Sequence, residues 1–175
     1  MYHPEFTKST QVRYRDAMEW LEQSMDNCSV QRTLDVIGEK WTFLVLREAF
    51  HGVRRFAEMQ EHTGAPRPVL AKRLAKLVDE DLLVRVPYQE PGQRERYEYQ
   101  LTPKGLDLYP AVNALREWGD RYLADPDGPA RTFLHRGCGA AVHAPLVCEQ
   151  GHVVGFSDVE SQAGPGARLA HERPA

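Results

Sequence analysis

The 175-residue chain lacks any hydrophobic run that approaches the roughly 18 residues needed to span a bilayer. Its first residues, MYHPEFTKSTQ, also lack the apolar stretch of a secretory signal. These two absences predict a cytoplasmic protein that has no membrane partner. The sequence contains no glycine-rich phosphate loop and no nucleophile motif, and it therefore indicates a protein that is not an enzyme.

Cysteine is scarce, and positive charge is not in excess. The three cysteines, Cys28, Cys138 and Cys148, are odd in number and widely spaced, which argues against a disulfide framework. The 22 lysines and arginines are outnumbered by 25 aspartates and glutamates, so the net charge is −3. This balance excludes a protein that coats nucleic acid indiscriminately, and any contact with phosphate must come from local clusters of cations.

One such cluster lies in GAPRPVLAKRLAKL, at positions 64–77. Apolar residues recur there at every third or fourth position, which predicts a helix with one buried stripe. Pro68 suits the first helical position, so we expect the helix to begin there and to run to about Glu80. The remaining positions of this helix carry four cations: Arg67, Lys72, Arg73 and Lys76.

The flanking segments predict three helices before this one and a hairpin after it. Apolar spacing and terminal glycines place the three helices at about 30–37, 40–50 and 55–62. After the basic helix, LLVRVPY and RYEYQLT alternate on either side of the turn QEPGQRE, which predicts a β-hairpin with Arg94 and Arg96 near its tip. Thr102 and Pro103 then cap a helix over 103–124. Its apolar face is longer than one small domain can cover, so we expect a homodimer.

The expected domain organisation follows from these elements and from composition. DPDGPA is typical of a linker, and the segment after it contains strand-like pieces at 142–147 and 152–156. We expect five parts: an N-terminal segment at 1–27, a helical domain with a hairpin at 28–124 whose last helix at 103–124 meets the second copy, a linker at 125–131, a small β-rich domain at 132–160 and a disordered tail at 161–175.

The order helix, short helix, glycine turn, basic helix and hairpin predicts a winged helix-turn-helix, a mainly α fold with a small β-hairpin wing. A helix about 10–12 Å across fits the major groove, where arginine and lysine reach guanine edges or phosphates. Lys76 lies in the C-terminal half of the basic helix, so a solvated position is as compatible with the sequence as a DNA contact. Arg55 fits either a phosphate clamp or an intramolecular salt bridge.

Three stretches carry a resemblance to a known family: LDVIGEKWTFLVLREAFHGVRRFAEM, VLAKRLAKLVDEDLLVR and RYEYQLTPKGLDLYPAVNALREWG. They resemble the HxlR-type winged helix-turn-helix transcriptional regulators, relatives of the MarR group, over about residues 28–123. The resemblance implies a homodimeric repressor or activator that binds double-stranded DNA at a pseudo-palindromic operator. It assigns the four cations to the recognition helix, Arg94 and Arg96 to the wing, and the N-terminal segment with the 103–124 helix to the dimer interface. Many members begin the recognition helix with Ser or Thr, and AlaProArgPro stands there instead.

Two features bear on how such a regulator is controlled. Cys28 precedes the first helix of the resemblance, where several HxlR-type members carry a thiol that responds to quinones, aldehydes or oxidants. A redox sensor and a small packed residue are both compatible with the sequence. A small organic effector is a further means of control.

The tail contains His135, Cys138, Cys148 and His152 in the spacing H-x2-C-x9-C-x3-H. Nitrogen and sulfur ligands of this kind suit tetrahedral Zn²⁺, and His143 could stand in for His135. The alternative is a metal-free hairpin, and DNA binding itself requires no cofactor.

A different class of function uses the winged helix as a scaffold. In that alternative, the protein is a protein-interaction or RNA-associated module whose C-terminal ribbon docks a partner. A scaffold does not need Arg67, Lys72 and Arg73 to face outward together, so the basic helix favours DNA.

Overall fold

The computed structural model describes residues 20–170. The chain divides into two units, one comprising residues 33–144 and the other comprising the chain up to residue 32 together with residues 145 onward. Most of the expected dimerisation segment and the end of the expected tail lie outside the described residues. Among the described helices, none combines the length and the apolar character required to cross a bilayer.

Four helices of the described residues lie directly before the hairpin, and their ranges agree with the predicted ranges to within one residue. They are α2 (Ser29–Ile37), α3 (Lys40–Phe50), α4 (Phe56–Thr63) and α5 (Arg67–Asp79). Gly64 ends α4 in the left-handed conformation, at φ 70°, which a residue with a Cβ atom rarely adopts. Pro66 then precedes α5 without a capping side chain, as the missing hydroxyl in the sequence implied.

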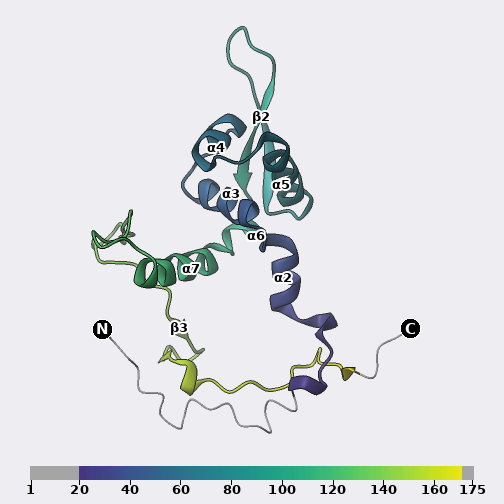
Figure 1. Ribbon diagram of the computed structural model, residues 1–175, viewed down its shortest axis with the longest axis vertical. Helices are drawn as coiled ribbons and strands as arrows, with labels where there is room; N and C mark the ends of the chain where they lie inside the picture. Colours follow the sequence, from purple (N-terminus) through teal and green to yellow (C-terminus); the bar gives the residue numbers. More distant parts are fainter. Residues whose placement is uncertain (1–19, 171–175) are drawn as a thin grey trace. The chain divides into compact units, whose positions relative to one another are not determined.

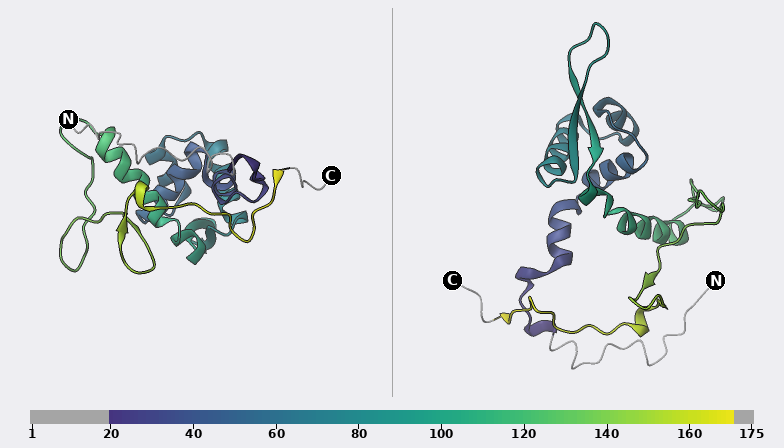
Figure 2. Two further views of the ribbon diagram at one scale, coloured as in Figure 1. Left: turned by 90° about the horizontal axis from the view of Figure 1, so that it is seen from below. Right: turned by 180° about the vertical axis from the view of Figure 1, so that it is seen from behind.

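The hairpin is confirmed as the wing. β1 (Leu83–Tyr88) pairs antiparallel with β2 (Arg96–Leu101), in a register that sets Leu83 opposite Leu101. Arg54 and Arg55 extend this sheet, because the Tyr99 N–H donates to the Arg54 carbonyl and Arg55 forms a bridge with Glu98. Figures 1 and 2 show the connection between the two strands projecting beyond α4 and α5.

The single helix predicted over 103–124 is wrong, because the structure has two helices, α6 (Pro103–Leu106) and α7 (Tyr109–Tyr122). Pro110 explains the break. A proline there cannot donate to the Leu106 carbonyl, and its ring would collide with that carbonyl in a continuous helix, whereas the first turn of a new helix accepts it. Thr102 caps α6 as predicted, accepting from the Gly105 N–H at 3.0 Å. Gly105 is required, since a Cβ atom there would lie 2.2 Å from the Leu82 carbonyl oxygen.

The core lies between α3, α4, α5 and the start of β1. Leu70, Leu74 and Leu77 of α5 are completely buried, and they pack in one cluster with Val45 and Leu46 of α3. Full burial of a leucine contributes about 1.5–3 kcal/mol to folding. The apolar stripe therefore fixes which face of α5 points inward and leaves its other face exposed.

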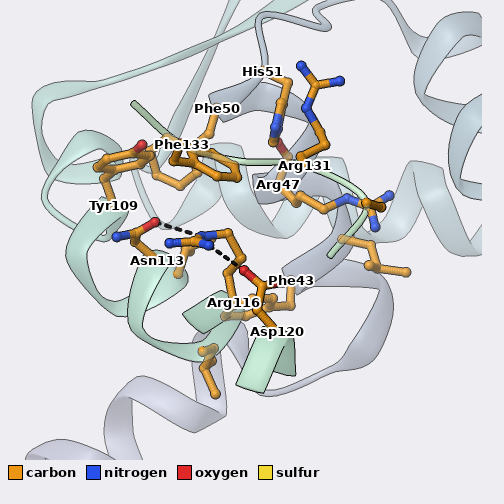
Figure 3. A pocket seen from close by; sticks show the side chains of 14 residues that line it. Phe43, Arg47, Phe50, His51, Tyr109, Asn113, Arg116, Asp120, Arg131 and Phe133 are labelled. Atoms are coloured by element: carbon orange, nitrogen blue, oxygen red, sulfur yellow. Dashed lines mark hydrogen bonds and ion pairs between the residues drawn. The ribbon is translucent and has the colours of Figure 1, made fainter. Parts of the chain in front are cut away.

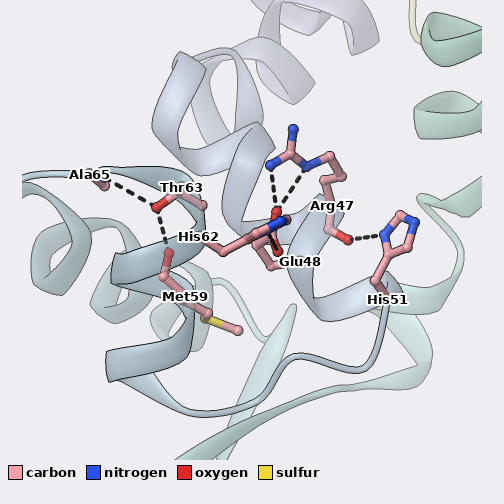
Figure 4. A network of polar contacts seen from close by, with 7 residues as sticks. All are labelled: Arg47, Glu48, His51, Met59, His62, Thr63 and Ala65. Carbon is pink, nitrogen blue, oxygen red and sulfur yellow. Dashed lines mark hydrogen bonds and ion pairs between the residues drawn. The ribbon is translucent and has the colours of Figure 1, made fainter. Parts of the chain in front are cut away.

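A buried carboxylate joins α3 to α4 (Figure 4). Glu48 is 2% exposed, and its Oε1 accepts from Arg47 Nε at 2.9 Å. His62 of α4 donates from Nδ1 to Oε2 at 2.6 Å. Burial by itself raises the pKa of Glu48, but the hydrogen bonds from Arg47 and His62 outweigh it and hold the pKa below its usual value. This carboxylate thus contributes stability that is present above its unfolded pKa and is lost as the pH falls through its folded pKa.

Residues 130–144 pack on the winged helix instead of forming a separate domain. The Phe133 ring stacks edge-on against His51 at 5.9 Å and under the Arg116 guanidinium at 4.4 Å. Glu117 of α7 binds the His143 ring and accepts from the Ala144 N–H at 2.9 Å. The expected 132–160 domain is therefore divided, with residues 132–144 in the same unit as α3 to α7.

The other unit has little regular structure. It contains a short 3₁₀ turn at Met25–Asn27 and a second at Phe156–Asp158. β3 (Leu146–Val147) pairs antiparallel with β4 (Val153–Val154), and both strands are shorter than predicted. Residues 161–170, expected to be disordered, follow a defined path in which the Ser24 N–H donates to the Arg168 carbonyl at 2.7 Å.

Candidate nucleic-acid interface

The exposed face of α5 presents two cations near its N-terminal half. Arg67 and Lys72 are both exposed, and the described residues provide no acidic partner for either. The Arg67 guanidinium lies 5.1 Å from the centre of the Phe56 ring, a cation–π contact that holds it at the start of the helix. These two side chains are therefore available to a polyanion in front of α5.

Arg73 and Lys76 are used within the protein. Arg73 is 14% exposed, and its guanidinium lies 2.8 Å from Glu39 Oε2 at the start of α3. The Lys76 ammonium donates to the Asp35 backbone carbonyl in α2. Both side chains thus brace α5 against the preceding helices. The DNA contacts expected of Arg73 and Lys76 stay predictions. For Lys76 the sequence left open a DNA contact or a solvated position, and the hydrogen bond to the Asp35 carbonyl is neither of these.

The sequence left open a phosphate clamp or an intramolecular salt bridge for Arg55, and the structure has the salt bridge. Its guanidinium lies 2.8 Å from Glu90 Oε1 and 4.5 Å from the centre of the Tyr88 ring. Desolvation lowers the pKa of Arg55, but the hydrogen bond to Glu90 outweighs it and raises the pKa. Because Glu90 lies in the wing loop and Tyr88 ends β1, Arg55 positions the wing.

The wing tip presents a second pair of cations. Arg94 and Arg96 are exposed, and neither has an acidic partner among the described residues. The loop has two acidic residues: Glu90 is already bonded to Arg55 and to Gln93 Nε2, and Glu95 is exposed between the two arginines in the sequence. With Glu90 bonded to Arg55, the two arginines outnumber Glu95, so the wing loop, which projects beyond α5 (Figure 1), keeps a net positive charge.

The expected metal ligands form two close pairs, one in each unit. His135 Nδ1 lies 3.3 Å from Cys138 Sγ, and Cys148 Sγ lies 3.6 Å from His152 Nδ1. A nitrogen and a sulfur on one tetrahedral Zn²⁺ are about 3.5 Å apart, so each pair fits half of a zinc site. Within residues 20–170, no three potential donors gather at one point. The four-ligand site stays a prediction from the sequence.

His143 does not fit the role of a spare ligand, since its ring binds Glu117. The Ala144 N–H, together with the His143 ring, holds the pKa of Glu117 below its usual value. This contact fixes the end of the 130–144 segment on α7. Nothing in the local sequence around either residue indicates it, because 26 positions separate the two.

A cavity of about 360 Å³ lies between α3, α7 and residues 130–133 (Figure 3). Four aromatic rings line it: Phe43, Phe50, Tyr109 and Phe133. The sequence does not predict this cavity, because its lining comes from three separate segments and none of them has a recognisable motif. Apolar spacing in α3 and α7 was the available signal, and it was interpreted as core and dimer interface.

α7 also carries exposed apolar side chains, and one of them, Leu115, borders the cavity as well. Trp118 is 56% exposed and Tyr122 is 62% exposed, and their rings lie 5.5 Å apart. Leu115 is also 56% exposed. A contiguous group of large apolar side chains is unusual on a monomer surface and typical of an interface.

Cys28 is a half-buried free thiol immediately before α2. Its carbonyl accepts from the Arg32 N–H at 3.0 Å, so it occupies the capping position of the helix. The Arg32 side chain, the expected neighbouring cation, donates to Asn27 Oδ1 at 2.9 Å.

Comparison with known proteins shows which family and which solved structures this chain is similar to. Residues 36–127 match the family described as HxlR-like helix-turn-helix. An uncharacterized HTH-type transcriptional regulator of Mycobacterium tuberculosis, Rv3095, is 43% identical over 157 residues, which cover 88% of this chain and 98% of the relative. The crystal structure of PA1607, described as a candidate transcription factor, matches with 35% identity and a TM-score of 0.70, over 79% of this chain and 96% of that one. The redox regulator HypR in its oxidised form matches with 28% identity and a TM-score of 0.50, over 56% of this chain and 100% of that one.

The metal prediction can be tested on purified protein. We expect about one Zn²⁺ per chain by elemental analysis, because two nitrogen and two sulfur ligands complete a tetrahedral site. Cys138→Ser and Cys148→Ser should each lower the zinc content, and Cys28→Ser, which changes the remaining thiol, should not. Protein that holds less than stoichiometric zinc, and recovers none on refolding with zinc, would rule out the site.

Proposed function

Because the chain belongs to the HxlR-like helix-turn-helix family of transcriptional regulators, we propose that it acts in the cytoplasm as a homodimeric repressor at a pseudo-palindromic operator. The observation that carries the proposal is the division of α5 into two faces. Its leucines are buried, while Arg67 and Lys72 are exposed without acidic partners among the described residues. A helix held in this way can enter the major groove with its exposed cations turned toward the DNA.

The proposal gives the basic residues different tasks. Arg67 and Lys72 contact base edges or phosphates in the major groove, and Arg94 and Arg96 contact the backbone or the minor groove beside it. Arg73 and Lys76 support α5 from behind through their contacts to Glu39 and to the Asp35 carbonyl. Supporting contacts of this kind matter for binding because a recognition helix that shifts loses several aligned contacts at once.

The second element of the proposal is the dimer. An operator with two half-sites requires two recognition helices at a fixed separation, which a two-fold dimer provides. The exposed group Leu115, Trp118 and Tyr122 on α7 supports an interface of this kind, because burying it against a second copy removes large apolar side chains from water.

The third element is release from the operator, by a small effector or by oxidation of Cys28. The position of Cys28 supports the thiol route, since it is a free and partly exposed thiol immediately before α2. The likeness to the redox regulator HypR also supports it. Oxidation to a disulfide between protomers would shift the two recognition helices relative to one another.

The DNA contacts predict a graded response to alanine substitution. Lys72→Ala should weaken operator binding by about 1–3 kcal/mol if Lys72 reads a base, and Arg94→Ala should weaken binding to all sequences and lower the salt dependence by about one ion. Fluorescence anisotropy on a footprinted operator and on a scrambled duplex, over a salt series, measures both effects. Arg136→Ala, which removes an exposed cation outside this surface, serves as the control. If both test variants bind like Arg136→Ala, the assignment fails.

The dimer predicts that an acid on α7 separates the protomers. Trp118→Asp should behave as a monomer in light scattering, since a carboxylate in an apolar interface is desolvated without a partner. The control is Leu134→Asp, at a leucine that is as exposed as Trp118, at 56%, but lies outside α7. A Trp118→Asp protein that remains a dimer at micromolar concentration would contradict this interface.

The thiol route predicts that operator affinity depends on oxidation. Treatment with diamide should change operator affinity in the wild-type protein and leave it unchanged in Cys28→Ser, while Cys148→Ser keeps the response. Wild-type affinity that is the same before and after diamide would reject redox control and leave effector release as the remaining mechanism.

A further inference from the structure

We propose that the cavity between α3, α7 and residues 130–133 binds a planar aromatic carboxylate and that this ligand is the effector of the protein. This inference rests on the proposed function, since it identifies the means of release. The cavity volume of about 360 Å³ lies within the range of small-molecule sites and suits one or two fused rings. None of the residues lining the cavity is one of the expected DNA contacts.

The walls of the cavity are aromatic and come from all three segments. Phe43 and Phe50 lie on α3, Tyr109 lies on α7, and Phe133 belongs to the segment after the linker. The Phe50 and Tyr109 rings are 5.2 Å apart at 58°, a tilted arrangement that presents ring edges as well as faces. Figure 3 shows the Phe50, Tyr109 and Phe133 rings gathered on one side of the cavity. A flat aromatic ligand can make stacked and edge-on contacts with walls of this kind.

The charges along the cavity select an acid. Of the three arginines that line it, Arg47 is paired with Glu48 and Arg116 is paired with Asp120. Arg131 is exposed and has no partner within residues 20–170. One positive charge is therefore uncompensated, and it lies on the segment that borders the aromatic walls. A guanidinium forms its best hydrogen bonds with a planar oxyanion such as a carboxylate.

The same segment connects the cavity to α7. Phe133 lies under the Arg116 guanidinium at 4.4 Å, and Arg116 in turn bonds to Asn113 Oδ1 at 2.9 Å and to Asp120. A ligand that displaces Phe133 thus disturbs contacts along two turns of α7. Because α7 also carries the exposed apolar group of the proposed dimer interface, occupancy of the cavity acts on the separation of the recognition helices.

The first experiment measures binding in the absence of DNA. Isothermal titration calorimetry with 2-naphthoate and with its neutral counterpart 2-naphthalenemethanol separates the contribution of the walls from that of the charge. Arg131→Ala should weaken 2-naphthoate binding about tenfold, the effect of losing one charge-assisted hydrogen bond, and should leave the alcohol unchanged. Arg136→Ala, a neighbouring exposed arginine that does not line the cavity, should bind both compounds like the wild type.

A second variant tests the location of the site. Val112→Trp fills the cavity from α7 and should abolish binding of both compounds. If that variant does not fold, nuclear Overhauser contacts between 2-naphthoate and labelled Phe and Tyr rings of the wild-type protein locate the ligand instead. Wild-type protein that binds neither compound at millimolar concentration overturns the proposal, as does a folded Val112→Trp protein that still binds them. Equal weakening of the acid and the alcohol by Arg131→Ala overturns the role of the charge.

A third measurement connects the ligand to the operator. Adding 2-naphthoate should lower the operator affinity of the wild-type protein and have a smaller effect on Arg131→Ala. Operator affinity that does not respond to bound 2-naphthoate overturns the role of the cavity as an effector site. Failure of operator binding without any ligand would instead overturn the proposed function, so the two failures are distinguishable.

Discussion

The contact between Glu48 and His62 is the interaction on which the helix-turn-helix depends. Glu48 is fixed within α3, and His62 lies in the last turn of α4, so their 2.6 Å hydrogen bond ties the end of α4 to α3. Gly64 comes directly after α4 in the sequence, and α5 begins three residues later, so a fixed end of α4 also fixes the start of α5. A carboxylate that is 2% exposed is costly to desolvate, and Arg47 offsets this cost from the other side. Removal of either donor would leave a buried charge only partly compensated and would therefore destabilise the contact between α3 and α4.

The four cations of α5 form two groups, one that contacts the neighbouring helices and one that is exposed. Turning the leucine face inward brings Arg73 and Lys76 toward α3 and α2, where Glu39 and the Asp35 carbonyl accept from them. Arg67 and Lys72 are left on the side away from those helices. The helix is thus held by electrostatic contacts as well as by apolar packing. This matters for a recognition helix, because phosphate contacts pull on it whenever the protein binds DNA.

Most of the winged helix could be predicted because its signals are local. Gly64, the leucine spacing of α5 and the alternation in β1 and β2 each lie within a few residues of the structure they determine. The break between α6 and α7 at Pro110 is hard to predict, because the apolar stripe continues through it. The periodicity therefore favours one continuous helix, although Pro110 has no N–H to donate. The binding of residues 143 and 144 to Glu117 could not be predicted, since a contact between positions 26 apart leaves no periodic trace. The same holds for Arg73 with Glu39, and it explains why the position of Arg73 on the helix indicated an exposed cation.

α7 is the element that both proposed events would share. One side of it lines the cavity through Val112 and Arg116, and Trp118 and Tyr122 are exposed elsewhere on its surface. Two binding events on one helix are coupled whenever each prefers a different position of that helix. The coupling is reciprocal, so a ligand that binds the free protein more tightly than the DNA-bound protein must weaken DNA binding by the same factor. A typical coupling of about 1–3 kcal/mol corresponds to roughly a 5- to 150-fold change in operator affinity. Contacts as modest as those that hold Phe133 against Arg116 and His51 are of the right size to supply it.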